Sequence, residues 1–282
     1  MLALITGASG GLGKVLSNQF WEAGFDLLVL GRNQEKLEEL RDSLDHRSGQ
    51  SCNVEVCDLS HGSSVEHFIN HKLKKLKNIN VLINNAAIHG SIGLFHENLI
   101  SDVRRVFEVN FISPVALCQT VVPMMIKKRQ GTIINISGGG ATSPRPMFSS
   151  YGAAKTALVR FSETIASEIG GSGVTINCIS PGIMATGLLK EVVDIGPLYS
   201  SDKEFELARK AIYEDAGEMN RVAKLALLLS SESGLRVNGK LISAIWDNWA
   251  NWGSGLDELN SSDAYTLRRI AGRDRDLNWA DK

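Results

Sequence analysis

Short apolar segments alternate with amphipathic ones along most of this chain. Seven short runs are predominantly apolar, as in strands that are buried on both faces of a sheet; they lie at residues 2–6, 26–30, 53–57, 80–84, 131–137, 174–180 and 239–245. Segments with apolar residues at helical spacing separate them, including 11–24, 33–44, 64–76 and 151–170. This alternation predicts an α/β fold with a doubly wound, seven-stranded parallel sheet and helices on both faces.

Two regions depart from the alternation. Residues 183–219 form a long insertion before the helical segment 221–232, and such insertions commonly cover a substrate site. Residues 246–282 follow the last strand and combine tryptophans with arginines. We expect residues 1–245 to form one domain that includes the insertion, and the 246–282 tail to pack on this domain or on a neighbouring subunit. An alternative is that the tail binds a phosphorylated or nucleotide-linked substrate.

The composition is that of an ordinary globular protein. Of 282 residues, 43% are hydrophobic and 22% charged, and the net charge is -1, which argues against disorder and against nucleic-acid binding. The four cysteines form no CxxC pair, so we expect free thiols and a cytoplasmic location. No apolar run reaches the roughly 18 residues of a membrane span, and a signal peptide is not expected. His67 and His71 have no third ligand nearby in sequence, so we expect no metal site.

A glycine-rich stretch, TGASGGLG at Thr6–Gly13, lies between the first predicted strand and the first predicted helix. Glycines there allow a sharp turn and close approach to a pyrophosphate, which the N–H groups of the following helix would bind. This context indicates a dinucleotide-binding Rossmann fold. The expected cofactor contacts in this stretch are Gly7, Ser9, Gly11, Leu12 and Gly13.

The end of the second strand indicates which dinucleotide is bound. A carboxylate there would bind the ribose 2′-OH of NAD, but the sequence has Gly31 followed by Arg32. An arginine can pair with the 2′-phosphate of NADP, so NADP is favoured and NAD remains possible. The alternative is that Arg32 is a solvated residue at the start of the next helix.

Together these motifs resemble the classical short-chain dehydrogenase/reductase family over residues 1–245. The matching segments are TGASGGLG, Asp58-Leu59, Asn84-Asn85-Ala86-Ala87, Asn110, Tyr151 to Lys155 as YxxxK, Pro181-Gly182 and Thr186. The resemblance implies an NAD(P)-dependent oxidoreductase that interconverts a carbonyl and an alcohol, as a homodimer or homotetramer. It also implies that Tyr151 is the acid or base, Lys155 tunes it and Asn110 anchors a proton-relay water. Further implied cofactor contacts are Asp58, Leu59, Asn85, Ala86, Pro181, Gly182 and Thr186, besides Tyr151 and Lys155 themselves.

The chemistry of the YxxxK pair can also be argued from its spacing. Tyr151 and Lys155 are four residues apart on a predicted helix and so share one face. A free tyrosine has a pKa near 10, and a nearby ammonium favours its phenolate. We therefore expect Lys155 to lower the pKa of Tyr151 towards the working pH.

One residue of the family pattern is absent from this sequence. The serine that binds the substrate carbonyl usually lies thirteen residues before the tyrosine, and here that residue is Gly138, preceded by Ser137. A bulge at the glycines could bring Ser137 to the substrate, or a loop hydroxyl could replace it. Alternatively, Gly138 leaves room for a bulky substrate or one with its own hydrogen-bond donor, which we favour. The candidate loop hydroxyls are Thr142, Ser143 and Ser149.

Two histidines, His89 and His96, follow the Asn-Asn-Ala-Ala segment, where we expect solvated loop positions rather than substrate contacts. The resulting hypothesis is an NADP-preferring oxidoreductase of small carbonyl compounds, with neither a nucleic acid nor a membrane as partner. A rival interpretation is a cofactor-binding protein that has lost catalysis and acts as a redox sensor. Gly138 keeps this rival open, whereas the presence of Tyr151, Lys155 and Asn110 argues against it.

Overall fold

A single parallel sheet organises the molecule. The computed structural model describes residues 1–213, 218–231, 234 and 236–277. Seven strands pair in the order β3-β2-β1-β4-β5-β6-β7, and every pairing is parallel. The strands are β1 Leu2–Thr6, β2 Asp26–Gly31, β3 Cys52–Val56, β4 Val81–Asn84, β5 Gly131–Ile136, β6 Val174–Ser180 and β7 Leu241–Ser243. The predicted fold class is confirmed.

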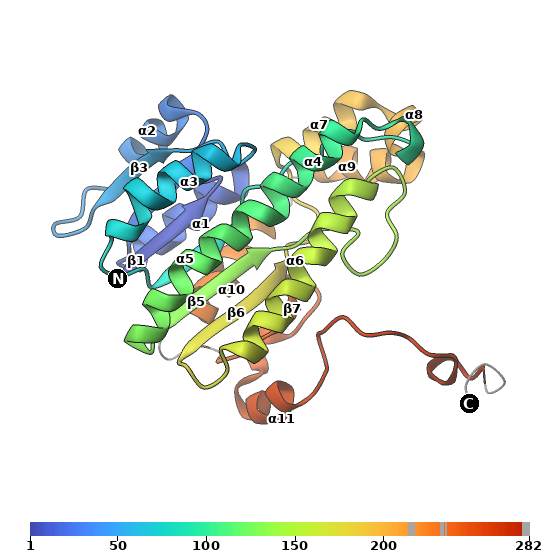
Figure 1. Ribbon diagram of the computed structural model, residues 1–282. Coiled ribbons are helices and arrows are strands. Elements are labelled where there is room, and N and C mark those ends of the chain that lie inside the picture. The colour runs from blue at the N-terminus through green and yellow to red at the C-terminus, as the bar shows by residue number, and fades with distance from the viewer. Residues whose placement is uncertain (214–217, 232–233, 235, 278–282) are drawn as a thin grey trace.

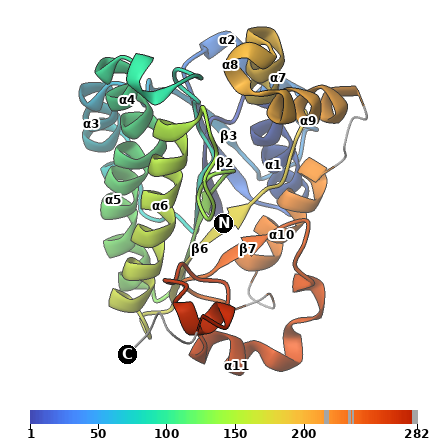
Figure 2. The ribbon, with the colours of Figure 1, turned by 90° about the vertical axis from the view of Figure 1, so that its right-hand side faces the viewer.

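Helices cover both faces of the sheet (Figure 2). One layer packs on the face that carries Ala3, Ile5 and Val29, and consists of α1 Gly11–Glu22, α2 Gln34–Ser43 and α10 Glu218–Ser230. The other packs on the face that carries Leu4, Leu82 and Ile133, and its main helices are α3 Gly62–His71, α5 Ser113–Lys128 and α6 Ser149–Glu168. The central strands β4 and β5 are buried at every residue, which explains their predominantly apolar sequence.

The strand order reverses between β1 and β4, because successive strands are added on one side of β1 and then on the other. In such sheets the loops at the carboxyl ends diverge at the reversal, and the crevice between them is where ligands bind. The β1–α1 and β4 loops, which hold the glycine-rich stretch and the Asn-Asn-Ala-Ala segment, flank this crevice.

Over its described residues 183–213, the insertion forms three helices near the carboxyl edge of the sheet: α7 Gly187–Ile195, α8 Pro197–Ser200 and α9 Asp202–Tyr213 (Figure 1). Val192 of α7 and Ala208 of α9 form an apolar cluster with Phe148 and Tyr151 at the start of α6. The insertion therefore covers the end of the sheet where Tyr151 lies.

The C-terminal tail packs along the outer side of β7. Trp249 is buried and its Nε1 donates to the Ala244 carbonyl at 3.0 Å, while the Leu241 N–H donates to the Tyr265 carbonyl at 2.8 Å. The tail includes α11 Leu256–Ser261, and its last described segment, with the short 3₁₀ helix Gly272–Arg275, extends away from the sheet (Figure 1).

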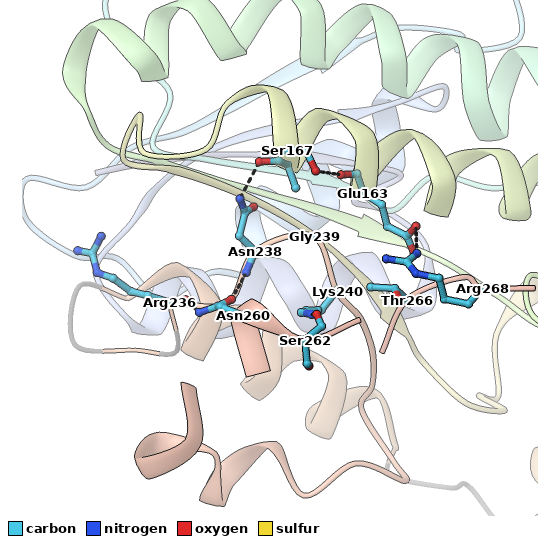
Figure 3. Close-up of a pocket in the computed structure, with 11 residues that line it drawn as sticks. Glu163, Ser167, Arg236, Asn238, Gly239, Lys240, Asn260, Ser262, Thr266 and Arg268 are labelled. Atoms are coloured by element: carbon cyan, nitrogen blue, oxygen red, sulfur yellow. Dashed lines mark hydrogen bonds and ion pairs between the residues drawn. The ribbon is translucent and has the colours of Figure 1, made fainter. Parts of the chain in front are cut away.

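A polar cavity of about 380 Å³ lies between the tail, the start of β7 and the second half of α6. Figure 3 shows Glu163, Lys240 and Arg268 around it. Lys240 Nζ donates to the carbonyls of Ser262 and Ala264, so it fixes the tail to β7. Because Glu163 is three helical turns beyond Tyr151 on α6, this cavity is separate from the candidate catalytic site.

The continuous helix over residues 100–128 is long and apolar enough, by length and mean hydropathy of 1.6, to cross a membrane. This helix was not predicted as a possible span, because its apolar residues do not form an uninterrupted run. In this fold the α5 part covers the sheet, with Leu117, Val121 and Met125 in the core. All four cysteines are free thiols, and Cys57, Cys118 and Cys178 are buried, as expected.

Candidate functional site

The β1–α1 turn has a shape that depends on glycine. Gly7 has φ +62°, and a Cβ there would lie 2.8 Å from the Ala86 Cα. At Gly13 a Cβ would lie 2.1 Å from the Gly7 carbonyl oxygen, so α1 begins tight against the turn. Leu12 points into the core, which leaves only its backbone to face a ligand. The turn thus brings the N-terminus of α1 to the crevice.

The β4 loop is fixed to this turn by hydrogen bonds. The Asn85 side chain donates to the carbonyls of Thr6 at 2.9 Å and Gly7 at 3.1 Å, and the N–H groups of Asn85 and Ala86 both donate to the Thr6 hydroxyl at 3.0 Å. Two segments far apart in sequence therefore form one rigid wall. The Asn85 side-chain N–H₂ is engaged with the protein backbone in this wall.

At the end of β2, Arg32 is exposed and lies near Asp58. Burial alone would raise the pKa of Asp58, but hydrogen bonds from the Ser60 N–H and hydroxyl, with the charges of His61 and Arg32, lower it below its usual value. The side chain of Leu59 is buried next to this carboxylate. A positive and a negative side chain thus flank the expected position of the adenosine.

The segment after β6 closes over the glycine-rich turn. Gly182 has φ +79°, and a Cβ on Gly11 would lie 3.4 Å from the Thr186 methyl group. Pro181 is buried, whereas Gly182 is exposed at this edge. Thr186 ends the loop as the residue before α7. The β6–α7 segment is therefore next to the glycine-rich turn.

These observations fit a dinucleotide. The backbone of the β1–α1 turn would approach the pyrophosphate, because no side chain stands at Gly7, Gly11 or Gly13. Ser9 lies beside the end of β2, since a Cβ on Gly31 would be 3.5 Å from its hydroxyl.

Tyr151 and Lys155 are both buried in the first turns of α6. Lys155 Nζ donates to the Ile136 carbonyl at 2.7 Å and lies 5.8 Å from the centroid of the Tyr151 ring. Burial lowers the pKa of Lys155 to about 8. The helix therefore places a phenol and an amine on one face, as predicted.

The pKa of Tyr151, in contrast, does not change in the direction that we expected. Burial raises the pKa of Tyr151 to about 12, and the charge that opposes this rise comes from Arg145. The prediction that Lys155 lowers the Tyr151 pKa is wrong for the protein without its cofactor, because burial penalises the phenolate more than nearby charge favours it. In this state Tyr151 is a protonated hydroxyl.

Asn110 occupies a π-helical turn, Glu108–Ile112, between α4 Ile100–Phe107 and α5. Its side chain is fully buried, donates to the Ile88 carbonyl at 2.9 Å and accepts from the Ile88 N–H at 3.0 Å. Single π-helical turns are frequent at functional sites. Here the turn attaches the helix to the loop that follows the Asn-Asn-Ala-Ala segment.

Gly138 faces the tyrosine. A Cβ on residue 138 would lie 2.2 Å from the Tyr151 hydroxyl oxygen, so the hydroxyl occupies the space that a side chain would need. The bulge considered for Ser137 is absent at this position: the Ser137 N–H continues the ladder to the Ile179 carbonyl at 2.8 Å. The Ser137 hydroxyl is buried without a hydrogen-bond partner among the described residues. The loop hydroxyls Thr142, Ser143 and Ser149 belong to exposed residues.

Two further side chains lie against Tyr151. The His89 ring is 4.9 Å from the tyrosine ring, and its Nδ1 is 3.4 Å from Glu191 Oε2 of α7. His89 is only 5% exposed, so the expectation of a solvated residue is wrong; it is buried because the insertion packs over its loop. His96 is exposed, as expected. Arg145 was not predicted from the sequence, although its place between three glycines and Tyr151 was a signal.

The chain is similar in sequence to known proteins. A profile of the family described as short chain dehydrogenase matches residues 1–195. The chain is 30% identical to a fatty acyl-CoA reductase of Acinetobacter baylyi over 243 residues, which cover 82% of this chain and 80% of that protein. It is 28% identical to the 3-oxoacyl-acyl-carrier-protein reductase FabG of Chlamydia trachomatis over 241 residues, 86% of this chain and 94% of that protein.

Among solved structures, the fold is similar to that of YwfH, an NADPH dependent reductase involved in bacilysin biosynthesis. The TM-score is 0.76 and the identity 24%, over 86% of this chain and 96% of that one.

Proposed function

Because this chain belongs to the short-chain dehydrogenase family and is an NAD(P)-dependent oxidoreductase acting on CH–OH or C=O groups, we propose that it prefers NADP and uses Tyr151 as its acid–base residue. The observation that carries the proposal is the Tyr151–Lys155 pair at the carboxyl edge of the sheet, beside the crevice flanked by the dinucleotide motifs. The proposal extends to Asn110 as the supporting polar group.

The cofactor, when bound, supplies or accepts a hydride at the carbon of the substrate C=O or CH–OH group. The residues of the chain do the rest. Gly7, Gly11 and Gly13 shape the turn that holds the pyrophosphate, and Thr186 covers it from the β6–α7 segment. The wall formed by Asn85 and Ala86 keeps the crevice rigid.

Tyr151 transfers the proton. Its raised pKa keeps the hydroxyl protonated at neutral pH, which suits donation to the oxygen of a carbonyl that receives hydride. The Lys155 ammonium, held by the Ile136 carbonyl, stabilises the phenolate that remains. Asn110 holds the Ile88 backbone and so sets the shape of the loop that carries His89.

We further propose that the chain works without the serine that this family uses near its tyrosine. Position 138 is the one that faces the Tyr151 hydroxyl, and it has no side chain. Ser137 would have to reorient to replace it, since its backbone is held in the β5–β6 ladder. The substrate must then be oriented by groups other than a hydroxyl at position 138.

The NADP preference rests on Arg32. Its guanidinium is exposed at the end of β2, where it can pair with a 2′-phosphate, and no carboxylate stands at the end of that strand. The sequence and the placement of Arg32 support this preference.

The test is the oxidation of NADPH with a panel of ketones, aldehydes and keto sugars. We expect Tyr151→Phe to lower the rate by about 10²- to 10⁴-fold with NADPH binding retained. Arg32→Ala should reduce the preference for NADPH over NADH by about tenfold or more, since one charge-assisted contact is lost. A panel in which wild type and Tyr151→Phe are equally slow would favour the redox-sensor interpretation.

A further inference from the structure

The loop between β5 and α6 places an arginine beside the candidate acid–base residue. The Arg145 guanidinium stacks on the Phe148 ring, with its Cζ 3.7 Å from the centroid, and the same atom is 5.9 Å from the centroid of the Tyr151 ring. Only 15% of the side chain is exposed. The side chain passes beside the glycine turn, since a Cβ on Gly139 would lie at the ordinary contact distance of 3.5 Å from Arg145 Cδ. A positive charge is thus held in the β5–α6 loop next to Tyr151.

The counter-ion of Arg145 comes from the insertion. Its Nη2 is 2.7 Å from Glu204 Oε2 of α9. Within the described part of the chain, this guanidinium forms no other hydrogen bond, although it has five N–H donors and can bind a carboxylate through two of them. Glu204 is 24% exposed and lies on a surface helix. The ion pair therefore uses one nitrogen of a guanidinium that could bind a carboxylate through two.

This unused capacity matters because Gly138 contributes no hydroxyl. Without that anchor at the carbonyl, a substrate needs another fixed contact to present its C=O group to Tyr151. A bidentate arginine–carboxylate contact fixes both distance and direction. A partly buried guanidinium also needs a negative partner at all times, and a substrate carboxylate can take the place of Glu204 at little electrostatic cost.

We propose that Arg145 is the substrate-recognition residue of this enzyme, and that its substrate is an oxo acid, or the corresponding hydroxy acid, whose carboxylate replaces Glu204 on the guanidinium. This rests on the proposed function, since Tyr151 is taken as the group that meets the carbonyl. Arg145 acts on binding and orientation, and Glu204 is its resident counter-ion when the site holds no substrate.

Kinetics with matched pairs of substrates test the proposal. The pairs are acetoacetate, 4-oxopentanoate and 2-oxo-4-phenylbutanoate, each compared with its methyl ester. We expect Arg145→Gln to raise KM for the acids by about 10- to 100-fold, the loss expected for a charged hydrogen-bonded contact, and to leave KM for the esters nearly unchanged. Glu204→Gln should have the opposite effect on KM. We expect KM for the acids to fall severalfold, because the competing carboxylate is removed.

The same helix provides a matched control. Glu206 pairs with Arg209 at 2.8 Å on the exposed side of α9, so Glu206→Gln removes an equivalent charge away from Tyr151 and should change neither KM. A purely structural role for Arg145, as a tie between α9 and the α6 loop, would change the kinetics of acids and esters by the same factor. If Arg145→Gln does not fold, the same comparison of KM for acids and esters is made with Arg145→Lys and Glu204→Gln.

Calorimetric titration of 4-oxopentanoate into the NADP-loaded protein separates binding from catalysis. Weaker binding to Arg145→Gln and tighter binding to Glu204→Gln support the proposal even if turnover is slow. Equal effects on acid and ester, or acid binding that is unchanged in both variants, overturn it while the carbonyl chemistry stands. If no carbonyl compound is turned over, the proposed function fails, and the calorimetric result still decides whether Arg145 binds the carboxylate.

Discussion

The three consecutive glycines at 138–140 have separate tasks. Gly138 makes room for the Tyr151 hydroxyl, Gly139 borders the Arg145 side chain at ordinary contact distance, and Gly140, with φ +94°, packs against Gly152 of α6. A Cβ at Gly140 would lie 3.0 Å from the Gly152 Cα. The turn therefore lets a tyrosine, an arginine and a helix approach the same short backbone segment.

Gly138→Ala tests the first of these tasks. The added Cβ would lie 2.2 Å from the Tyr151 hydroxyl oxygen, so the phenol must move. We expect kcat/KM to fall by about 100-fold, because a shift of roughly 1 Å at a reacting group has that effect, and the free energy of unfolding to fall by about 1–3 kcal/mol. Steady-state kinetics and urea unfolding measure the two effects.

The control for that variant is Gly139→Ala, whose Cβ meets Arg145 Cδ only at 3.5 Å, an ordinary contact distance. It should retain most of the stability. Full activity in Gly138→Ala would mean that the tyrosine has a second productive position.

Lys155 gives a prediction about pH. Its pKa is lowered by burial from 10.5 to about 8, so between these values the unfolded chain binds a proton that the folded chain does not. Stability of the wild type should therefore rise with pH across this window, relative to Lys155→Met, which cannot titrate there. We expect the difference in free energy of unfolding to change by roughly 1–3 kcal/mol between pH 7.5 and pH 10.

Urea unfolding of both proteins at the two pH values measures this change, and the difference between them cancels the titration of all other groups. A difference that does not vary with pH would show that the folded protein leaves the Lys155 pKa at its unfolded value.

At the scale of elements, the sequence pattern located the sheet well because its inner strands are buried on both faces, although the edge strand β3 has no buried residue. Strands β1 and β6 have the predicted bounds, since a continuous apolar run ends where burial ends. Strand β7 was predicted at 239–245 but forms only over Leu241–Ser243. Ala244 and Ile245, which follow it, pack against the core outside the strand, and an apolar run cannot distinguish those two forms of burial.

The parts of the site that were predicted are those with local sequence signals. A glycine-rich turn and a tyrosine and lysine four residues apart follow from backbone geometry alone. The roles of His89, Arg145 and Glu204 depend on where α7 and α9 lie, and nothing local in the 183–219 segment specifies how it packs on α6. The π-helical turn at Asn110 was also missed, because an extra residue in a helical turn leaves apolar periodicity almost unchanged.

At the scale of the whole molecule, the two irregular regions close opposite ends of the sheet. The insertion covers the carboxyl edge through an apolar cluster around Tyr151 and two contacts with charged groups, His89 with Glu191 and Arg145 with Glu204. The tail covers the exposed side of β7 and the far end of α6. An uncovered edge strand is prone to pairing with other chains, so the tail protects the sheet as well as stabilising it.

Two truncations distinguish the parts of the tail. A chain that ends after Asp247 loses the buried Trp249, the hydrogen bond to the Leu241 N–H and both carbonyl acceptors of Lys240. We expect its free energy of unfolding to fall by at least about 3 kcal/mol, the loss typical of removing one buried tryptophan, together with self-association through β7. A chain that ends after Arg269 keeps these contacts and should change by no more than about 0.5 kcal/mol.

Urea unfolding and light scattering of the three lengths measure stability and association together. Residues 270–277, the described part of the segment after Arg269, extend away from the sheet, so we expect a large effect of removing them to come from a contact with another chain (Figure 1). If the chain that ends after Arg269 loses stability by an amount that depends on protein concentration, that contact is one with a second copy. If that chain instead loses stability by an amount independent of concentration, the segment after Arg269 stabilises its own chain, which contradicts the division of the tail at Arg269.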